Sequence, residues 1–190
     1  LTVQLPDLNL SKVKVTHGDY SKSQLEAAMA ASVDSTVAAA RQHIVGRASI
    51  VFAAGVEHAE NLAAGLNGVG IKSECVTGTM PRAAREAVYD RFRDGQLDAM
   101  VTVAVLTEGA DFPRCDAVLM ARPTKSRTLY IQMVGRALRP YPGKLDALVV
   151  DLTGAARGHS LTTLSDLVTE APTKTVDLAG DEVDEPTDEP

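Results

Sequence analysis

Residues 48–53 read Ala-Ser-Ile-Val-Phe-Ala, a short apolar run that leads directly into a stretch with helical spacing at residues 56–66. An apolar run of this length, without alternating polar positions, is typical of a strand buried on both faces of a sheet. The pattern therefore predicts an α/β fold, with a mainly parallel sheet and helices on both faces. The same rhythm continues along the chain, with further apolar runs at residues 71–76, 98–103, 117–121 and 147–151 and helical stretches at residues 81–93 and 126–138. A last helix is expected at residues 161–168.

The loops that follow these runs are expected to gather at one edge of the sheet, because right-handed crossovers bring the C-terminal ends of parallel strands together. Ala54 and Gly55 follow the first run, and Thr77 and Gly78 follow the second. At Ala54 and Gly55, small residues let a ligand approach the backbone, and the free amides at the start of the next helix can bind a phosphate. The alternative there is an ordinary tight turn. His58 is expected to be a surface residue of the first of these helices.

Acidic residues surround a glycine in the loop after the third run, which contains Glu108, Gly109 and Asp111. A carboxylate in such a loop can accept hydrogen bonds from ribose hydroxyl groups. Thr102, at the end of the run, offers a hydroxyl group for a phosphate oxygen. The alternative interpretation of this loop is a capped turn.

Basic residues follow the second and fourth runs. Arg82 and Arg85 lie one turn apart and could contact a phosphate backbone, whereas the other two arginines of that helix are expected to pair with acids on a solvated face. Residues 122–127 form a basic, hydroxyl-rich loop that could grip a backbone or cap the next helix through Thr124 or Ser126. The pairs expected on the solvated face are formed by Arg91 and Arg93 with Glu86 and Asp90.

Residues 130–140 read Tyr-Ile-Gln-Met-Val-Gly-Arg-Ala-Leu-Arg-Pro and are predicted to be helical up to Pro140, which cannot continue a helix. Gln132, Arg136 and Arg139 are spaced by four and three residues and would share one helix face. Arginine suits the oxygens of a phosphoryl group, so this face could hold an anion. The alternative is a solvated charged face. The apolar positions expected to pack inward are Leu129, Met133, Val134 and Leu138.

The chain has 190 residues, 45% of them hydrophobic, which suits one well-cored domain. Tryptophan is absent and aromatic residues make up only 4%, which argues against a site built on stacked aromatic rings. No signal peptide and no apolar run of about 20 residues is evident, and a first residue other than Met indicates a fragment. Cys75 and Cys115 lack metal-binding spacing and are expected to be reduced thiols of an intracellular protein. A cytoplasmic location, of bacterial or phage-like type, is expected.

The formal net charge of −6 arises at the C-terminus. Residues 177–190 hold seven acids and no base, and without them 18 acids face 19 bases. We expect residues 171–190 to be a disordered acidic tail, with an interaction segment as the alternative.

Five stretches together resemble the C-terminal RecA-like lobe of superfamily 2 helicases, most like those of RadD-like and type III restriction translocases. The resemblance implies a RecA-like three-layer sandwich at residues 48–170, with residues 1–47 as a helical lead-in from a first lobe. The stretches are Ile50-Val-Phe52, Thr77-Gly78 with Arg85 and Phe92-Arg-Asp-Gly95, Leu106-Thr-Glu-Gly-Ala-Asp-Phe-Pro113, Ala121-Arg-Pro-Thr124, and Gln132-x-x-Gly-Arg-x-x-Arg139.

The resemblance implies roles for individual residues. Arg136 and Arg139 are similar to the paired arginine fingers that reach the γ-phosphate of ATP, and Gln132 is similar to the polar residue that opens the same motif. Glu108, Gly109 and Asp111 correspond to positions that meet the nucleotide. The positions that would line a nucleic-acid path are Ala54, Gly55, Thr77, Gly78, Arg85 and Thr102.

The sequence also lacks parts of an ATPase. It contains no Gly-x-x-x-x-Gly-Lys-Ser/Thr loop and no Asp-Glu-x-His or Asp-Glu-Ala-Asp motif. The resemblance thus implies that ATP and Mg²⁺ are held mainly by an N-terminal RecA-like lobe of the same protein, and that this chain alone is inactive. Gln132 stands where RNA helicases of the DEAD-box branch carry His, which favours DNA over RNA as partner.

Two other classes of function compete with a helicase. A non-catalytic RecA-like module that binds nucleic acid or protein remains an alternative, although the intact Gln132, Arg136 and Arg139 argue against it. A nuclease or metal enzyme is disfavoured because no carboxylate cluster follows the predicted strands. A membrane partner is not expected.

Overall fold

The computed structural model describes residues 1–3, 5, 10, 12–16, 18–103, 110–152 and 175–176. Its main sheet has the strand order β5-β6-β4-β7-β8-β1-β9, and all its recorded strand pairs are parallel. The strands are β1 (Thr2–Val3), β4 (Ser49–Ala53), β5 (Ser73–Val76), β6 (Ala99–Thr102), β7 (Ala117–Ala121), β8 (Leu148–Asp151) and β9 (Thr175–Val176).

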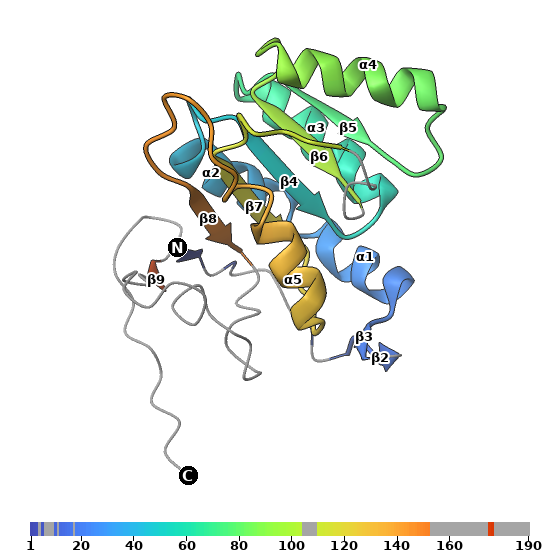
Figure 1. Ribbon diagram of the computed structural model, residues 1–190. Coiled ribbons are helices and arrows are strands. Elements are labelled where there is room, and N and C mark those ends of the chain that lie inside the picture. The colour runs from blue at the N-terminus through green and yellow to red at the C-terminus, as the bar shows by residue number, and fades with distance from the viewer. Residues whose placement is uncertain are drawn as a thin grey trace.

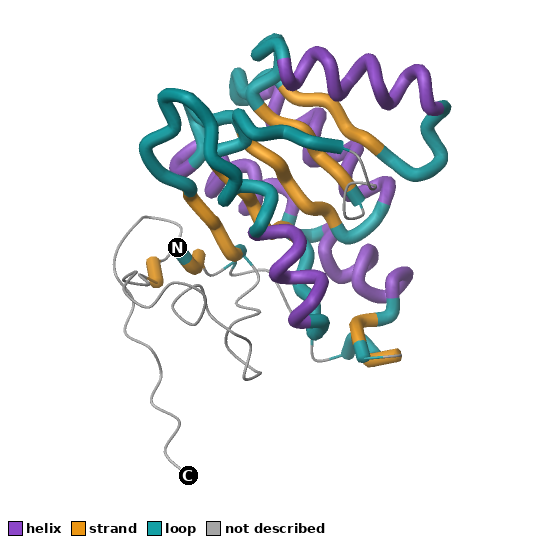
Figure 2. Tube along the Cα trace, in the orientation of Figure 1, coloured by secondary structure: helices purple, strands orange, loops and turns teal. Residues whose placement is uncertain are grey.

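Five helices accompany the sheet in the described part of the chain (Figures 1 and 2). A short antiparallel hairpin, β2 (Val15–Thr16) with β3 (Asp19–Tyr20), precedes the first of them. The helices are α1 (Lys22–Ala30), α2 (Val33–His43), α3 (Val56–Gly68), α4 (Arg82–Arg93) and α5 (Arg127–Val134).

Successive residues of the central strands supply two separate cores, because side chains along a strand alternate between the faces of the sheet. Val51 and Ala53 pack with α2 and α3, whereas Ile50 and Phe52 pack with α4 and α5. All five residues of β4 are buried, as a strand covered on both faces must be. The predicted α/β class and three-layer sandwich are therefore confirmed.

The residues before β4 also contribute to this body. Backbone hydrogen bonds join Leu1 to β8, from Asp151 N to Leu1 O at 2.8 Å and from the Leu1 ammonium to Val149 O at 2.9 Å. Side chains of α2 belong to the core on the face of α3. Sequence patterning missed β1 because it is two residues long. The predicted domain boundaries remain a prediction.

The predicted strands and helices are observed with small differences at their ends, except for the helix that contains Gln132. That helix was expected over residues 126–138 but ends at Val134. The Gly135 N–H still bonds to Ile131 O, but the next two amides, of Arg136 and Ala137, bond three residues back, which tightens the chain into turns. Gly135 favours the end of the helix at this point, because glycine loses much backbone freedom in a helix. The helix therefore ends before it reaches Pro140. A helix expected at residues 161–168 lies outside the described residues.

In the described ranges, none of the helices has the length and apolar character needed to cross a bilayer.

Candidate functional site

Arg136 and Arg139 meet the segment of residues 110–112 that precedes β7. The Arg136 Nη1 atom donates a hydrogen bond to the Ala110 carbonyl oxygen at 2.9 Å. The Arg139 guanidinium forms an ion pair with the Asp111 carboxylate. The early end of α5 places both arginines on the turns after the helix, so two cations and an acid come together beside the sheet.

The sequence predicted that Gln132 shares one helix face with these arginines, and the structure shows that it does not. It lies within α5 on an exposed position, whereas Arg136 and Arg139 both follow the helix. Met133 and Val134 are buried as expected, and Leu129 packs partly against the same core. Leu138 is 45% exposed instead of facing inward, because the chain has already left the helix there.

The segment that receives the arginines is anchored by Phe112, whose side chain is buried. The Phe112 ring makes edge-to-face contacts with Tyr89 and Phe92 of α4, at centroid distances of 5.1 and 5.6 Å. The Arg93 guanidinium lies 5.2 Å from the centre of the Phe112 ring, and its Nε donates to Asp111 O at 3.4 Å. These contacts fix the position of the loop against α4.

Arg93 thus belongs to the candidate site, whereas its place in the sequence predicted only an ion pair on a solvated face. It also forms the expected ion pair with Asp90, at 2.8 Å. Arg91 pairs with Glu74 of β5 rather than with Glu86, through hydrogen bonds of 2.7 and 2.5 Å. The Arg93 guanidinium also lies 5.9 Å from the centre of the Tyr89 ring, and the four-residue spacing of this pair was a signal in the sequence.

The two finger candidates raise the positive charge of the site. Burial lowers the pKa of Arg136, and repulsion by the Arg139 guanidinium lowers it further, while Asp111 acts in the opposite direction. Close cations of this kind are stabilised by an arriving anion. The donor geometry therefore suits a phosphoryl group.

The remaining residues predicted to meet nucleotide or phosphate are distributed along the strand ends. Thr102 is buried at the end of β6, and Thr77 is buried after β5 with its Oγ1 atom 3.0 Å from Thr79 Oγ1. Gly78 is exposed, and a Cβ atom there would meet no other atom within 4 Å. Arg85 is half-buried in the first turn of α4. The candidates Glu108 and Gly109 lie outside the described residues.

Ala54 and Gly55 are covered by α1, which lies at the C-terminal end of β4 (Figure 1). The Glu26 carboxylate of α1 accepts a hydrogen bond from the Glu57 amide at 3.0 Å, at the start of α3. A Cβ atom on Gly55 would lie only 1.9 Å from Glu26 Cδ. The group that approaches this small-residue turn in the structure is therefore an internal carboxylate, which also complements the helix dipole.

A second internal carboxylate, that of Asp19 in the hairpin, binds the basic loop after β7. It accepts hydrogen bonds from Arg122 Nη2 at 3.1 Å, from Thr124 Oγ1 at 3.1 Å and from the Lys125 amide at 2.9 Å. Ser126 Oγ accepts a hydrogen bond from the Leu129 amide at 3.3 Å, so Ser126 caps α5. A cap for this helix was one of the two alternatives that the sequence left open for the loop. Neither Asp19 nor Glu26 could be recognised from sequence patterns, because their partners lie far away along the chain.

His58 is buried, and the expectation of a surface residue was wrong. Only 1% of it is exposed, and its Nδ1 atom accepts a hydrogen bond from the Ala54 amide at 3.1 Å. His58 faces inward from the first turn of α3, because the Ala54 amide at the end of β4 donates a hydrogen bond to its ring. Burial lowers the pKa of His58 to about 4.

The shifted pKa of His58 predicts acid sensitivity of the fold. Its folded-state pKa lies below the unfolded value of about 6.5, so protons bind the unfolded chain more strongly and stability falls as the pH drops from about 6.5 towards 4. We expect His58 to account for a loss on the order of 2 kcal/mol between pH 7.5 and pH 5, measured by urea unfolding.

The matched variant for this measurement is His58→Gln, which cannot titrate. The pKa of His43 is lowered by burial as well, and its contribution cancels when the two proteins are compared at each pH. Equal losses of unfolding free energy in both proteins would contradict the prediction.

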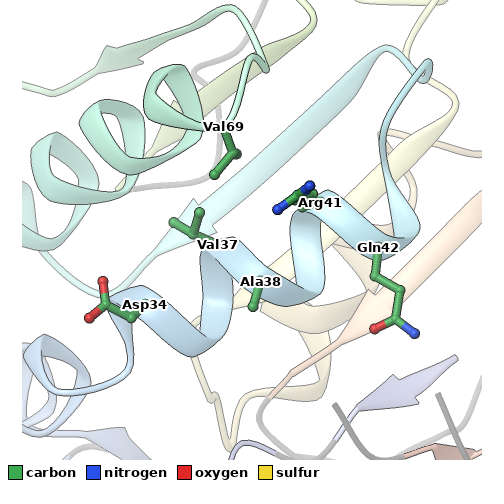
Figure 3. Close-up of a pocket in the computed structure, with 6 residues that line it drawn as sticks. All are labelled: Asp34, Val37, Ala38, Arg41, Gln42 and Val69. Carbon is green, nitrogen blue, oxygen red and sulfur yellow. The ribbon is translucent and has the colours of Figure 1, made fainter. Parts of the chain in front are cut away.

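A pocket elsewhere on the described part of the chain has no role in this site. A shallow pocket of about 460 Å³ lies on α2 beside the end of α3, on the opposite sheet face from α5, and Figure 3 shows its lining. No cluster of three or more His, Cys, Asp or Glu side chains that could hold a metal occurs within the described ranges.

A family model described as helicase conserved C-terminal domain matches residues 31–141, which include the strand ends, the segment at 110–112 and both finger candidates. The chain belongs to this helicase C-terminal domain family. Its resemblance to superfamily 2 helicases is thereby confirmed.

Individual relatives agree with this assignment. The putative mitochondrial ATP-dependent helicase irc3 of Schizosaccharomyces pombe is 34% identical over 144 residues, which cover 75% of this chain and 24% of that protein. The chain spans between 22% and 35% of the length of the first three curated relatives that it matches.

Solved structures support the fold. A fragment of a putative HsdR subunit of a type I restriction enzyme from Vibrio vulnificus superposes with a TM-score of 0.63 at 21% identity, covering 96% of this chain and 37% of that one. Saccharomyces cerevisiae Dbp5 L327V, bound to RNA and ADP BeF3, superposes with a TM-score of 0.63 at 17% identity, covering 93% and 41%.

Proposed function

We propose that this chain is the C-terminal motor lobe of an ATP-dependent DNA helicase or translocase, and that it supplies arginine fingers to an ATP site shared with an N-terminal lobe. The observation that carries the proposal is the convergence of Arg136 and Arg139 on Ala110 and Asp111. Two guanidinium groups with one acid between them match the charge that develops on a phosphoryl group in transfer.

In this proposal ATP and Mg²⁺ are held mainly by the N-terminal lobe, and the present chain contributes cations from one side. Closure of the lobes brings Arg136 and Arg139 to the γ-phosphate, with Gln132, Glu108 and Gly109 at the same interface. Asp111 releases Arg139 and becomes available to the ribose. Reopening after hydrolysis moves the lobes along nucleic acid. We assign the protein to the cytoplasm, and we expect this lobe alone to be inactive.

The proposed nucleic-acid path runs over the C-terminal strand ends. Thr77, Gly78, Arg85 and Thr102 lie along β5, β6 and the start of α4. Ala54 and Gly55 are reached only through α1, since Glu26 and the apolar residues of that helix cover them. Thr77 and Thr102 are buried, so the accessible part of the path is formed by Gly78 and Arg85 on the side of α4.

DNA is favoured over RNA by Gln132, which stands where DEAD-box RNA helicases carry His. Likeness to an RNA-bound protein argues only for the shared fold, because the identity is 17%. The alternative function is a non-catalytic RecA-like module, for which a full-length protein without ATPase activity would be expected.

The test of the DNA assignment is the ATPase rate of the full-length protein with duplex DNA, single-stranded DNA or RNA added at equal nucleotide concentration. We expect duplex DNA to stimulate hydrolysis most. Stimulation by RNA alone would overturn the DNA assignment but keep the motor. A purified full-length protein with no ATPase under any of these conditions would support the non-catalytic alternative.

A further inference from the structure

Lys144 binds three backbone carbonyl groups with its ammonium group. Its Nζ atom donates to Cys115 O at 2.6 Å, to Arg139 O at 2.8 Å and to Ala137 O. An ammonium group has three N–H donors and no acceptor. Each donor of Lys144 is therefore used by one carbonyl group of the chain.

The turn before Lys144 presents it to these carbonyl groups. The Lys144 amide bonds to Tyr141 O at 3.1 Å, and Gly143 has a φ of 81°. With Pro142 at the second position and a left-handed glycine at the third, residues 141–144 form a type II turn. This turn is part of the loop that connects α5 to β8 (Figure 1). Its Pro-Gly sequence limits the conformations open to the loop and so preorganises the lysine.

The three carbonyl groups belong to the two segments that form the candidate site. Ala137 and Arg139 lie on the turns that carry both finger candidates, and Cys115 closes the segment that begins with Ala110 and Asp111. Lys144 thus links the segment that supplies the arginines to the segment that receives them.

The contacts of Lys144 differ in kind from the contacts of the arginines. Arg136 and Arg139 reach across with side chains that must reorient when a phosphoryl group arrives. The recorded hydrogen bonds of Lys144 all go to backbone oxygens, which need not change partner in that step. They can hold the backbone of the turn while the two guanidinium groups move.

We infer that Lys144 is a positioning residue for the finger arginines: its ammonium tripod fixes the turn of residues 136–139 against residues 110–115. The inference rests on the proposed role of Arg136 and Arg139. Lys144 is not assigned contact with nucleotide, because its three donors are already used. A misplacement of reacting groups by about 1 Å can cost on the order of 100-fold in rate, so loss of the tripod should appear in turnover.

The test replaces Lys144 by Met, which keeps the aliphatic stem and removes the donors. In the full-length protein we expect Lys144→Met to lower the kcat of ATP hydrolysis by about 10- to 100-fold, with the KM for ATP and the Kd for DNA within about threefold of wild type. Lys144→Arg keeps the charge, but its planar fork cannot reproduce the tripod, so an intermediate kcat is expected. Lys72→Met, at an exposed lysine, is the matched control and should retain wild-type kcat.

Amide hydrogen exchange distinguishes a local loosening of the turn that carries the arginines from a loss of stability of the whole fold. We expect amides of residues 135–141 to exchange faster in Lys144→Met, while those of β4 and α3 keep wild-type rates. A general rise in exchange over the whole chain would indicate a purely structural role and overturn the inference. If Lys144→Met does not fold, Lys144→Gln is measured in its place with the same criteria.

The outcomes separate this inference from the proposed function. If Arg136→Ala abolishes ATPase and Lys144→Met keeps wild-type kcat, the positioning role is wrong and the motor function stands. If Arg136→Ala also keeps wild-type kcat, the proposed function itself fails. Equal losses in kcat and in DNA affinity for Lys144→Met would likewise overturn the positioning role.

Discussion

Replacing Arg136 by Ala in the full-length protein is expected to lower the ATPase rate by about 10³-fold or more while leaving DNA affinity nearly unchanged. The guanidinium group at this position is half-buried and fixed on Ala110 O, beside a second arginine. An arginine that acts mainly on the transition state affects kcat more than ground-state binding. Arg139→Ala is expected to have an effect of the same kind.

The ion pair between Arg139 and Asp111 is too weak to oppose this role. The two side chains are 43% and 61% exposed, and exposed pairs contribute about 0–1 kcal/mol. A phosphoryl group with charge on three oxygens, in a site closed by a second lobe, offers stronger hydrogen bonds. Arg139 can therefore exchange Asp111 for nucleotide at small cost.

The structure offers a matched control for both arginine variants. Arg41 is an exposed residue of α2, which covers the sheet face opposite α5. Arg41→Ala removes an exposed guanidinium on that opposite face and should keep wild-type ATPase. The measurement is steady-state ATP hydrolysis with saturating DNA, together with DNA affinity by fluorescence anisotropy. Wild-type turnover in Arg136→Ala and Arg139→Ala would exclude the finger assignment.

The sheet could be predicted from the sequence because its strands are buried on both faces. Burial of that kind leaves an uninterrupted apolar run, and residues 49–53 and 117–121 were found with at most one residue of error at an end. The parallel direction of the strands then follows from their alternation with helices, whereas their order and register depend on pairing between segments far apart in the sequence. By contrast, β1 has two residues and was missed, since it depends on pairing with β8 rather than on its own pattern.

The sequence indicated Arg136, Arg139 and Asp111 as candidates, but it did not indicate how they come together. The spacing of Arg136 and Arg139 suggested one helix face, yet both follow the end of α5. Their convergence on residues 110–111 depends on contacts across more than 25 residues of sequence. Periodicity describes local structure, so it cannot report how a turn meets a distant loop.

Long-range contacts also explain the groups that the sequence did not indicate. Glu26 and Asp19 bind the starts of α3 and of the loop after β7 from a segment without a strong pattern of its own. His58 was misassigned because its acceptor role depends on the Ala54 amide at the strand end. In each case the deciding partner is a backbone amide, which is present at almost every position and leaves no sequence signal.

Replacing Phe112 by Ala is expected to lower the free energy of unfolding by about 3–5 kcal/mol. Only 2% of Phe112 is exposed, and its ring contacts Tyr89 and Phe92 edge to face. Truncation leaves a cavity between α4 and the segment that receives the arginines. It also removes the ring on which Arg93 lies, at 5.2 Å.

Urea unfolding of the 190-residue chain, followed by circular dichroism, measures this change. Phe112→Leu keeps most of the volume and should cost about 1–2 kcal/mol, and Tyr141→Ala, at a side chain that is 46% exposed, should stay within about 0.5 kcal/mol of wild type. A loss below about 1 kcal/mol for Phe112→Ala would show that the ring does not anchor the loop. Because Phe112 directly follows Asp111, the same variant should also lower ATPase in the full-length protein at temperatures where it remains folded. This joint effect separates an anchor of the site from an ordinary core residue such as Leu66, whose truncation should lower stability without a comparable fall in kcat.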